Sequence, residues 1–358
     1  MGCTRARLVP FLVVATLAAA GYGGGATGED GGDEAGWIIA LLDRIPGGPA
    51  PTDAAVVDLA AAAAAAGIGV PGAGASDEAI AAFFSGLPRD AVPPSLLTDP
   101  FPDFGALRTE LGLDPARVVR VITAGLPDSS YQVLEGDFDA ASIDAASIDA
   151  AVHADPVWSD LLAEAEHRGV AFYAWGEDFQ IDVSRVTPVR RLGRGGRLAL
   201  DGRFLYWVPW TGGLEVLIDA GAGAVGTLAD DSRFTRTARA LEAQGVYSAV
   251  IGDRLLDGGD SGRALGLGGG RDQEGSFWVM VAVHDTDAGA EAAAAEVRAV
   301  LTGGTIAATG GPWSERVAGF EVTVEGDMLV VVARAAAGEG DWQRAYYTRD
   351  PLVLAAAG

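Results

Sequence analysis

The fold is decided by the stretch between Gly196 and Asp253, which contains the segment Leu198-Ala199-Leu200-Asp201-Gly202-Arg203-Phe204-Leu205-Tyr206-Trp207-Val208. Two alternating apolar runs on either side of Asp201-Gly202 predict a β-hairpin. The chain continues with an apolar run, a glycine loop, a helical pattern at 234–244 and a strand pattern at 246–251. This succession of strands and helices predicts a fold that contains both.

The glycine loop is Gly221-Ala222-Gly223-Ala224-Val225-Gly226, which matches the dinucleotide-binding pattern G-x-G-x-x-G. In that pattern a strand precedes the loop, a helix follows at once, and an acid ends the next strand. Under this interpretation Gly221, Gly223, Gly226 and Asp253 would form the cofactor site of a nucleotide-dependent enzyme.

Two features favour a purely structural loop. Leu214, Leu217 and Ile218 are spaced as one face of a helix, so the loop would follow a helix rather than a strand. Asp230 and Asp231 would repel a diphosphate, and either is suited to capping the next helix. We therefore expect a helix–loop–helix connection that binds no dinucleotide, and a protein without a cofactor.

Beyond this stretch, the order of elements repeats. A strand at 131–134 leads into Asp137-Phe138-Asp139 and an alanine-rich helix, and a strand at 277–283 leads into Asp285-Thr286-Asp287 and another such helix. Each helix is followed by a hairpin and a further helix, and a spare strand lies at 118–124. We expect an α+β protein with an N-terminal helical cap and two ferredoxin-like βαββαβ repeats, the second completed by the spare strand.

The expected organisation has six parts. They are a signal peptide (1–26), a flexible acidic Gly-rich tether (27–36), a helical cap region (37–115), the first α/β repeat (116–256), a Gly-rich linker (257–275) and the second α/β repeat (276–358). Within the cap, a helix is expected from Thr52 or Asp53 to Ala66, because alanine dominates this stretch.

The N-terminus is typical of an export signal. Arg5 and Arg7 precede the apolar run Leu8–Ala20, which is too short to span a bilayer comfortably. The following Ala18-Ala19-Ala20-Gly21 and the Gly-rich tether resemble bacterial lipoprotein signals, but the lipid-bearing cysteine is replaced by Tyr22. We expect an extracytoplasmic protein, secreted or associated with the cell envelope, that contacts the membrane only if this segment is retained.

Composition narrows the function. The 358 residues have a formal net charge of −24, and every cation is arginine. Such acidity repels nucleic acid, so nucleic-acid binding is excluded from the working hypotheses. The only cysteine is Cys3, inside the expected signal, so the mature chain would have no thiol chemistry.

Two further sets of residues are candidates for a site. Asp137, Asp139, Asp285 and Asp287 are possible metal ligands, although helix capping explains them more simply. Tyr206, Trp207 and Trp210 are candidates for a ligand surface. Strand alternation sends Tyr206 and Trp207 to opposite faces of the sheet, and burial in the core is the favoured interpretation of these aromatics.

Short phrases along the chain resemble those of uncharacterised exported bacterial proteins: Ile45-Pro46, Leu134-Glu135-Gly136-Asp137-Phe138-Asp139, Leu228-Ala229-Asp230-Asp231, Tyr247-Ser248-Ala249-Val250 and Arg349-Asp350-Pro351-Leu352. That resemblance implies export and a shared fold, and no activity. We expect a non-enzymatic protein that offers a surface to a protein or small-molecule partner in the cell envelope. The alternative is the nucleotide-dependent enzyme.

Overall fold

The structure is a computed structural model that describes residues 36–48, 53–91, 103–125, 129–138, 143–253, 263–336 and 341–358. From Ala35 onward these residues belong to one structural unit. The expected signal peptide, nearly all of the tether, Asp139 and the first part of the expected linker lie outside the described residues.

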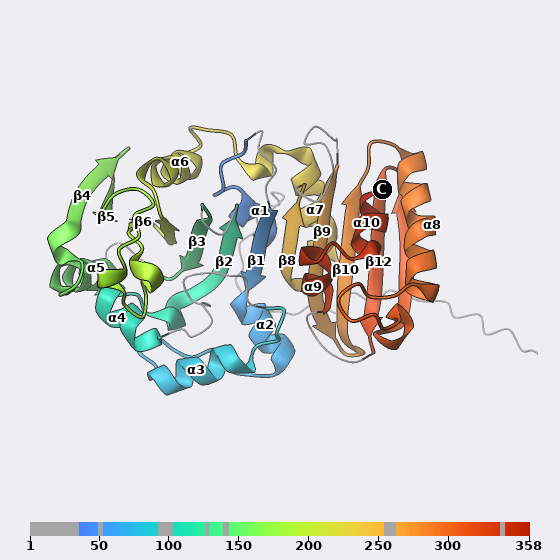
Figure 1. The fold of residues 1–358 in the computed structure, drawn as a ribbon, viewed down its shortest axis with the longest axis horizontal. Helices are drawn as coiled ribbons and strands as arrows, with labels where there is room; N and C mark the ends of the chain where they lie inside the picture. The colour runs from blue at the N-terminus through green and yellow to red at the C-terminus, as the bar shows by residue number, and fades with distance from the viewer. Residues whose placement is uncertain are drawn as a thin grey trace, which may run out of the picture. The chain divides into compact units, whose positions relative to one another are not determined.

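The described residues contain twelve strands. They are β1 (Asp53–Asp58), β2 (Val118–Ala124), β3 (Tyr131–Gly136), β4 (Leu162–His167), β5 (Val170–Trp175), β6 (Gly196–Asp201), β7 (Phe204–Val208), β8 (Val246–Gly252), β9 (Ala264–Asp272), β10 (Gly275–Val283), β11 (Val317–Glu325) and β12 (Met328–Ala335). All belong to one sheet in the order β11-β12-β10-β9-β8-β1-β2-β3-β7-β6-β5-β4 (Figure 1). Every neighbouring pair is antiparallel.

The α-helices pack on both faces of this sheet. They are α1 (Trp37–Leu42), α2 (Leu59–Ala66), α3 (Asp77–Gly86), α4 (Phe104–Leu111), α5 (Ile143–Ala154), α6 (Thr211–Gly221), α7 (Ser232–Ala243), α8 (Asp287–Gly303), α9 (Asp341–Tyr347) and α10 (Pro351–Ala357). One face is covered by α1, α6 and α7, and the other by α2 to α5 and α8 to α10. The α+β class is therefore confirmed, as a three-layer arrangement.

The prediction of two ferredoxin-like repeats is wrong. The strand at 118–124 was expected to complete the second repeat, but it is β2 and pairs with β1 and β3. The sheet is continuous, and its order runs symmetrically outward from the central pair β1 and β8. We call β1-β2-β3-β7-β6 with the added β5-β4 the first half, and β8-β9-β10-β12-β11 the second half.

Two segments have a structure that differs from the prediction. Residues 53–58 are strand β1 rather than the start of a helix, and only 59–66 is helical. Val56 and Val57 are buried on opposite faces at the centre of the sheet, where β-branched side chains fit a strand. The expected Gly-rich linker contains strand β9. Its glycines lie against neighbouring side chains that leave no room for a Cβ, so they serve packing within the sheet rather than flexibility.

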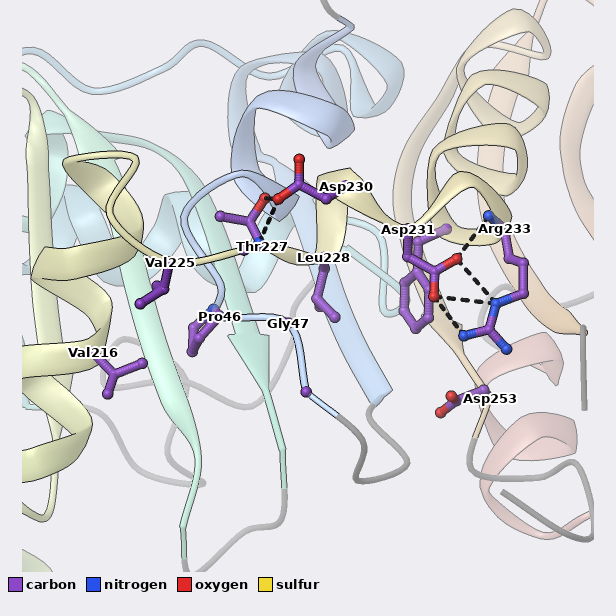
Figure 2. Close-up of a pocket in the computed structure, with 13 residues that line it drawn as sticks. Pro46, Gly47, Val216, Val225, Thr227, Leu228, Asp230, Asp231, Arg233 and Asp253 are labelled. Carbon is purple, nitrogen blue, oxygen red and sulfur yellow. Dashed lines mark hydrogen bonds and ion pairs between the residues drawn. The ribbon is translucent and has the colours of Figure 1, made fainter. Parts of the chain in front are cut away.

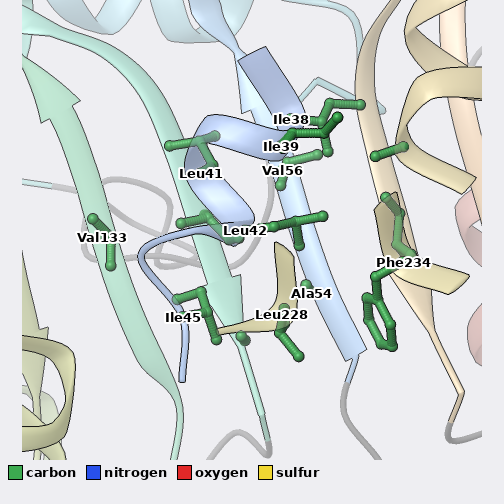
Figure 3. Close-up of a cluster of buried hydrophobic side chains, with 14 of the residues drawn as sticks. Ile38, Ile39, Leu41, Leu42, Ile45, Ala54, Val56, Val133, Leu228 and Phe234 are labelled. Carbon is green, nitrogen blue, oxygen red and sulfur yellow. The ribbon is translucent and has the colours of Figure 1, made fainter. Parts of the chain in front are cut away.

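Strand β1 and helix α1 form the middle of the main core cluster. Figure 3 shows Ile38, Leu41 and Leu42 of α1 beside Val56 of β1. These four side chains are at most 1% exposed. Burying an aliphatic side chain of this size is worth about 1.5–3 kcal/mol, so this short helix is held by packing rather than by its own helical propensity.

Candidate functional site

A cleft of about 450 Å³ lies where the two halves of the sheet meet (Figure 2). Its lining comes from Pro46–Gly48 after α1, from Val216 of α6, from eight residues between Val225 and Phe234, and from Asp253 directly after β8. This volume is within the range of small-molecule sites. Gly226 and Asp253, singled out by the glycine pattern, both line the cleft.

The glycine loop follows a helix, as the spacing of its apolar residues predicted. It leaves the C-terminal end of α6, and its first amides are used there. The amide of Ala222 donates to Ile218 and that of Gly223 to Ala220, both at 2.9 Å. These amides already have acceptors, and the C-terminal end of a helix dipole is negative, so the geometry opposes a bound phosphate.

At two of the three positions, the structure explains why the residue is glycine. A Cβ on Gly221 would lie 2.7 Å from the hydroxyl of Tyr206, so this position requires a residue without a side chain. Gly223 has a φ of +67°, a left-handed conformation that glycine adopts readily where a helix ends. The match to the dinucleotide pattern thus follows from how α6 ends and packs.

Two carboxylates lie at the N-terminal end of α7 and in the turn before it. Asp230 accepts a hydrogen bond from the amide of Thr227 at 2.8 Å. Asp231 is the N-cap of α7 and accepts from the amide of Arg233 at 2.9 Å. The expected capping is therefore confirmed, and negative charge already occupies the helix end where a dinucleotide would place its pyrophosphate.

The charged side of the cleft is mainly acidic. Arg233 donates to the carboxylate of Asp231 through Nε at 3.0 and 3.1 Å, and the negative charge of Asp253 also favours the cationic form of Arg233. Hydrogen bonding to Arg233 lowers the pKa of Asp231, and the same bond raises the pKa of Arg233. With Asp230, the lining contains three carboxylates and one guanidinium, which gives it a formal charge of −2.

The other side of the cleft is apolar. Val216 and Val225 border it, and Leu228 and Phe234 connect it to the main core cluster. Leu228 is 5% exposed and Phe234 is 2% exposed. Since Leu228 donates its amide to the carbonyl of Ile45 at 2.9 Å, the segment after α1 is fixed against this wall. The cleft is therefore preformed.

Three of the four aspartates considered as metal ligands, Asp137, Asp285 and Asp287, belong to the described residues, and Asp139 does not. Thr286, rather than either neighbouring aspartate, caps α8. Asp137 and Asp285 follow β3 and β10, and four strands lie between these two in the sheet order. Among the described residues, no group of three or more His, Cys, Asp or Glu is arranged to hold a metal ion.

The aromatic candidates lie away from the cleft. Tyr206 is fully buried in the main core cluster, which confirms the core interpretation. Burial raises its pKa to about 12. Trp207 is half-buried on the opposite face, 6.1 Å from the ring of Trp175. Trp210 is half-buried beside the ring of Phe179, which is stacked on it at 5.3 Å.

Comparison with known proteins identifies no family. No family model and no curated protein matches the sequence. Two solved structures, crystal forms III and I of a protein designated TP0453, are similar over 88% of this chain, with TM-scores of 0.40 and 0.39 and sequence identities of 9% and 10%. The matched regions cover 97% and 96% of the chains in those two structures. No helix among the described residues is long and apolar enough to cross a membrane.

Proposed function

We propose that this protein is a non-enzymatic binding protein that takes a small organic cation into the cleft. The observation that carries this proposal is that the cleft has an acidic side, with Asp231 and Asp253, and an apolar side, with Val216 and Val225 (Figure 2). A protonated amine attached to an apolar group satisfies both sides. Each ion pair at 4 Å is worth about 1 kcal/mol in water and about 4 kcal/mol near a protein surface.

The chemistry of the lining supports binding rather than catalysis. Its titratable side chains are the three aspartates and Arg233. Where a pKa shift is resolved, it favours the charged form: that of Asp231 is lowered and that of Arg233 is raised. A general base or acid needs a pKa moved toward neutrality, which is the opposite shift for an aspartate.

The alternative function is that of a nucleotide-dependent enzyme. The cleft does contain Gly226 and Asp253, but the amides of Thr227 and Arg233 already donate to the carboxylates of Asp230 and Asp231, and Asp231 is the N-cap of α7. Binding a dinucleotide there would require the phosphates to displace carboxylates from amides, at a cost above the roughly 0.3–1 kcal/mol that a helix dipole typically contributes.

The proposal places the protein outside the cytoplasm. Its support is the basic start and the apolar run Leu8–Ala20, which lie outside the described residues. N-terminal sequencing of protein from the native host should show loss of about 20–26 residues, the usual length of a signal peptide. Intact Met1 in the cytosol would reject this part of the proposal.

A thermal-shift panel tests the ligand class. Phenethylamine, phenethyl alcohol and 3-phenylpropionate share a phenyl group and differ in charge. We expect a saturable rise in melting temperature with the amine, because a ligand that binds only the folded state stabilises it by mass action. Equal shifts with all three compounds would remove the role of the acidic side, and a shift with the carboxylate alone would overturn the proposal.

A further inference from the structure

The connection between β5 and β6, residues 176–195, displays apolar side chains to solvent, and we call it the apolar loop. Its exposed members are Phe179, Ile181, Val183, Val186 and Leu192, which are 52–76% exposed. They are five of the eleven large apolar side chains exposed among the described residues. Such a concentration on one segment marks an interaction surface, since scattered single residues are the rule elsewhere.

A buried arginine fixes the base of the apolar loop. Arg197 of β6 is 4% exposed and donates to the carbonyls of Trp175 at 3.2 Å and Gly176 at 2.9 Å. Its Nε donates to the hydroxyl of Thr211 at 2.9 Å, and its guanidinium pairs with Asp178 at 2.8 Å. The loop therefore leaves the sheet in one defined direction.

A second buried arginine holds the far end of the loop. The side chain of Arg190 is fully buried, pairs with Asp155 at 2.8 Å and lies 4.5 Å from the ring centre of Trp175. Between these anchors the two arms of the loop pair with each other, through the amides of Asp182 and Gly195. A preorganised surface loses little entropy on binding.

Two of the exposed apolar residues also have an energetically unfavourable backbone conformation. Phe179 and Leu192 have φ values of +57° and +62°, in the left-handed region that favours glycine. Bulky residues in this conformation persist only where the surrounding structure holds them. Here the ring of Phe179 stacks on Trp210 with an interplanar angle of 15°.

We propose that the apolar loop is the surface through which two copies of this chain associate. The argument for this occupant is charge. The whole chain has 49 acidic residues and 25 arginines, so most pairings of two copies would oppose like charges. Apart from the buried Arg190, residues 176–195 have three arginines and three acidic residues, and a two-fold pairing of this segment brings both signs opposite one another.

A substitution at the most exposed member tests the proposal. Val183 is 76% exposed, so Val183→Asp should leave the fold intact and place a carboxylate inside the interface. The matched control is Val70→Asp, since Val70 is also exposed, at 52%, and lies outside the loop. Both full-length variants and the wild type are compared by sedimentation velocity and by light scattering over a hundredfold range of concentration.

We expect wild type and Val70→Asp to form dimers, and Val183→Asp to need at least about tenfold higher concentration to do so, because burying an unpaired charge is costly. A wild type that stays monomeric up to several hundred micromolar would contradict the proposal. So would a dimer unaffected by Val183→Asp. Flotation of the wild-type monomer, but not of Val183→Asp, with phosphatidylcholine vesicles would reassign the loop to a lipid surface and overturn the dimer.

Discussion

Two arginines, one in each half of the sheet, are placed over aromatic rings in opposite surroundings. Arg190 in the first half has no exposed side-chain surface, and its partner Asp155 is 1% exposed. Arg334 of β12 in the second half is 33% exposed, pairs with Asp272 at 2.7 Å, and lies 5.3 Å from the ring centre of Phe277. The contact between a paired arginine and an aromatic ring is therefore buried in the first half and partly exposed to solvent in the second half.

The difference follows from what each half carries beyond the shared strand order. The first half continues past its hairpin β6–β7 into β5 and β4, and the connections that precede β4 and join β5 to β6 contain the buried pair Asp155 and Arg190. The second half ends at β11, whose residues between Ala318 and Glu321 are exposed. Strand order alone therefore does not fix the strength of such a pair, because the segments around it decide whether its charges are buried.

Removing the buried arginine should have the largest effect. Arg190→Ala leaves Asp155 buried without its charged partner, and breaking such a pair costs about 3–5 kcal/mol. Arg334→Ala, the matched change in the second half, should cost less than about 1 kcal/mol, because the pair is exposed. Urea denaturation followed by circular dichroism measures both. Equal losses of stability in the two variants would show that burial of the Arg190–Asp155 pair does not matter.

Strand β9 gives the next largest effect. A Cβ on Gly269 would lie 2.1 Å from Oδ2 of the buried Asp90, which accepts a hydrogen bond from Trp342 at 2.6 Å. Overpacking of this kind typically costs about 1–3 kcal/mol, so Gly269→Ala should lower the free energy of unfolding by that amount. The control is Gly319→Ala on β11, where nothing lies within 4 Å. A stable Gly269→Ala would show that Asp90 can move aside.

The histidines of the two halves should respond to pH in opposite directions. Burial, with the nearby Arg263, lowers the pKa of His284, although Asp285 and Asp327 act against this shift. The folded protein therefore binds this proton more weakly than the unfolded chain. The stability that depends on neutral His284 is present above the usual histidine pKa and is lost as the pH falls below it.

His153 in the first half has the reverse sign. A hydrogen bond to the carbonyl of Asp149, and then one with Glu164, raises its pKa, so its contribution is present at low pH and is lost as the pH rises through the raised value. Denaturation of His284→Gln and His153→Gln between pH 5 and 8 should show slopes altered in opposite senses. Identical pH profiles for wild type and both variants would contradict these assignments.

The smallest expected effect is none at all. Millimolar NAD, NADP or FAD, with or without magnesium, should leave the melting temperature unchanged, because the amides of Ala222 and Gly223 are bonded within the end of α6. A saturable rise that disappears in Gly223→Val would instead establish the dinucleotide site and favour the enzyme.

Much of the fold was predictable from local patterns. The hairpin β6–β7 and the helices on either side of the glycine loop follow directly from apolar spacing. Strand β1 was not predictable in this way, because alanines around Val56 and Val57 favour a helix until pairing with β2 and β8 is known. Nor was β9, whose glycines make room for neighbours distant in sequence, such as Trp342.

The cleft was predictable only in part. Gly226 and Asp253 were found through a pattern that the structure explains differently. Arg233 and Pro46 were missed, because their place in the lining depends on the pairing of Pro46 with Thr227, which brings together segments about half the chain apart. No local signal marks such a contact, since it depends on the tertiary packing of α1.

Calorimetric titration of phenethylamine into the wild type and Asp253→Asn measures whether the acidic, preformed cleft between the two halves binds an organic cation. Losing one carboxylate near the ligand should weaken binding about tenfold, since a contribution of about 1.4 kcal/mol corresponds to that factor. Asp272→Asn, at the surface of the second half, should bind as the wild type does. Equal affinities for the wild type and Asp253→Asn, or no heat of binding with either, would contradict the account.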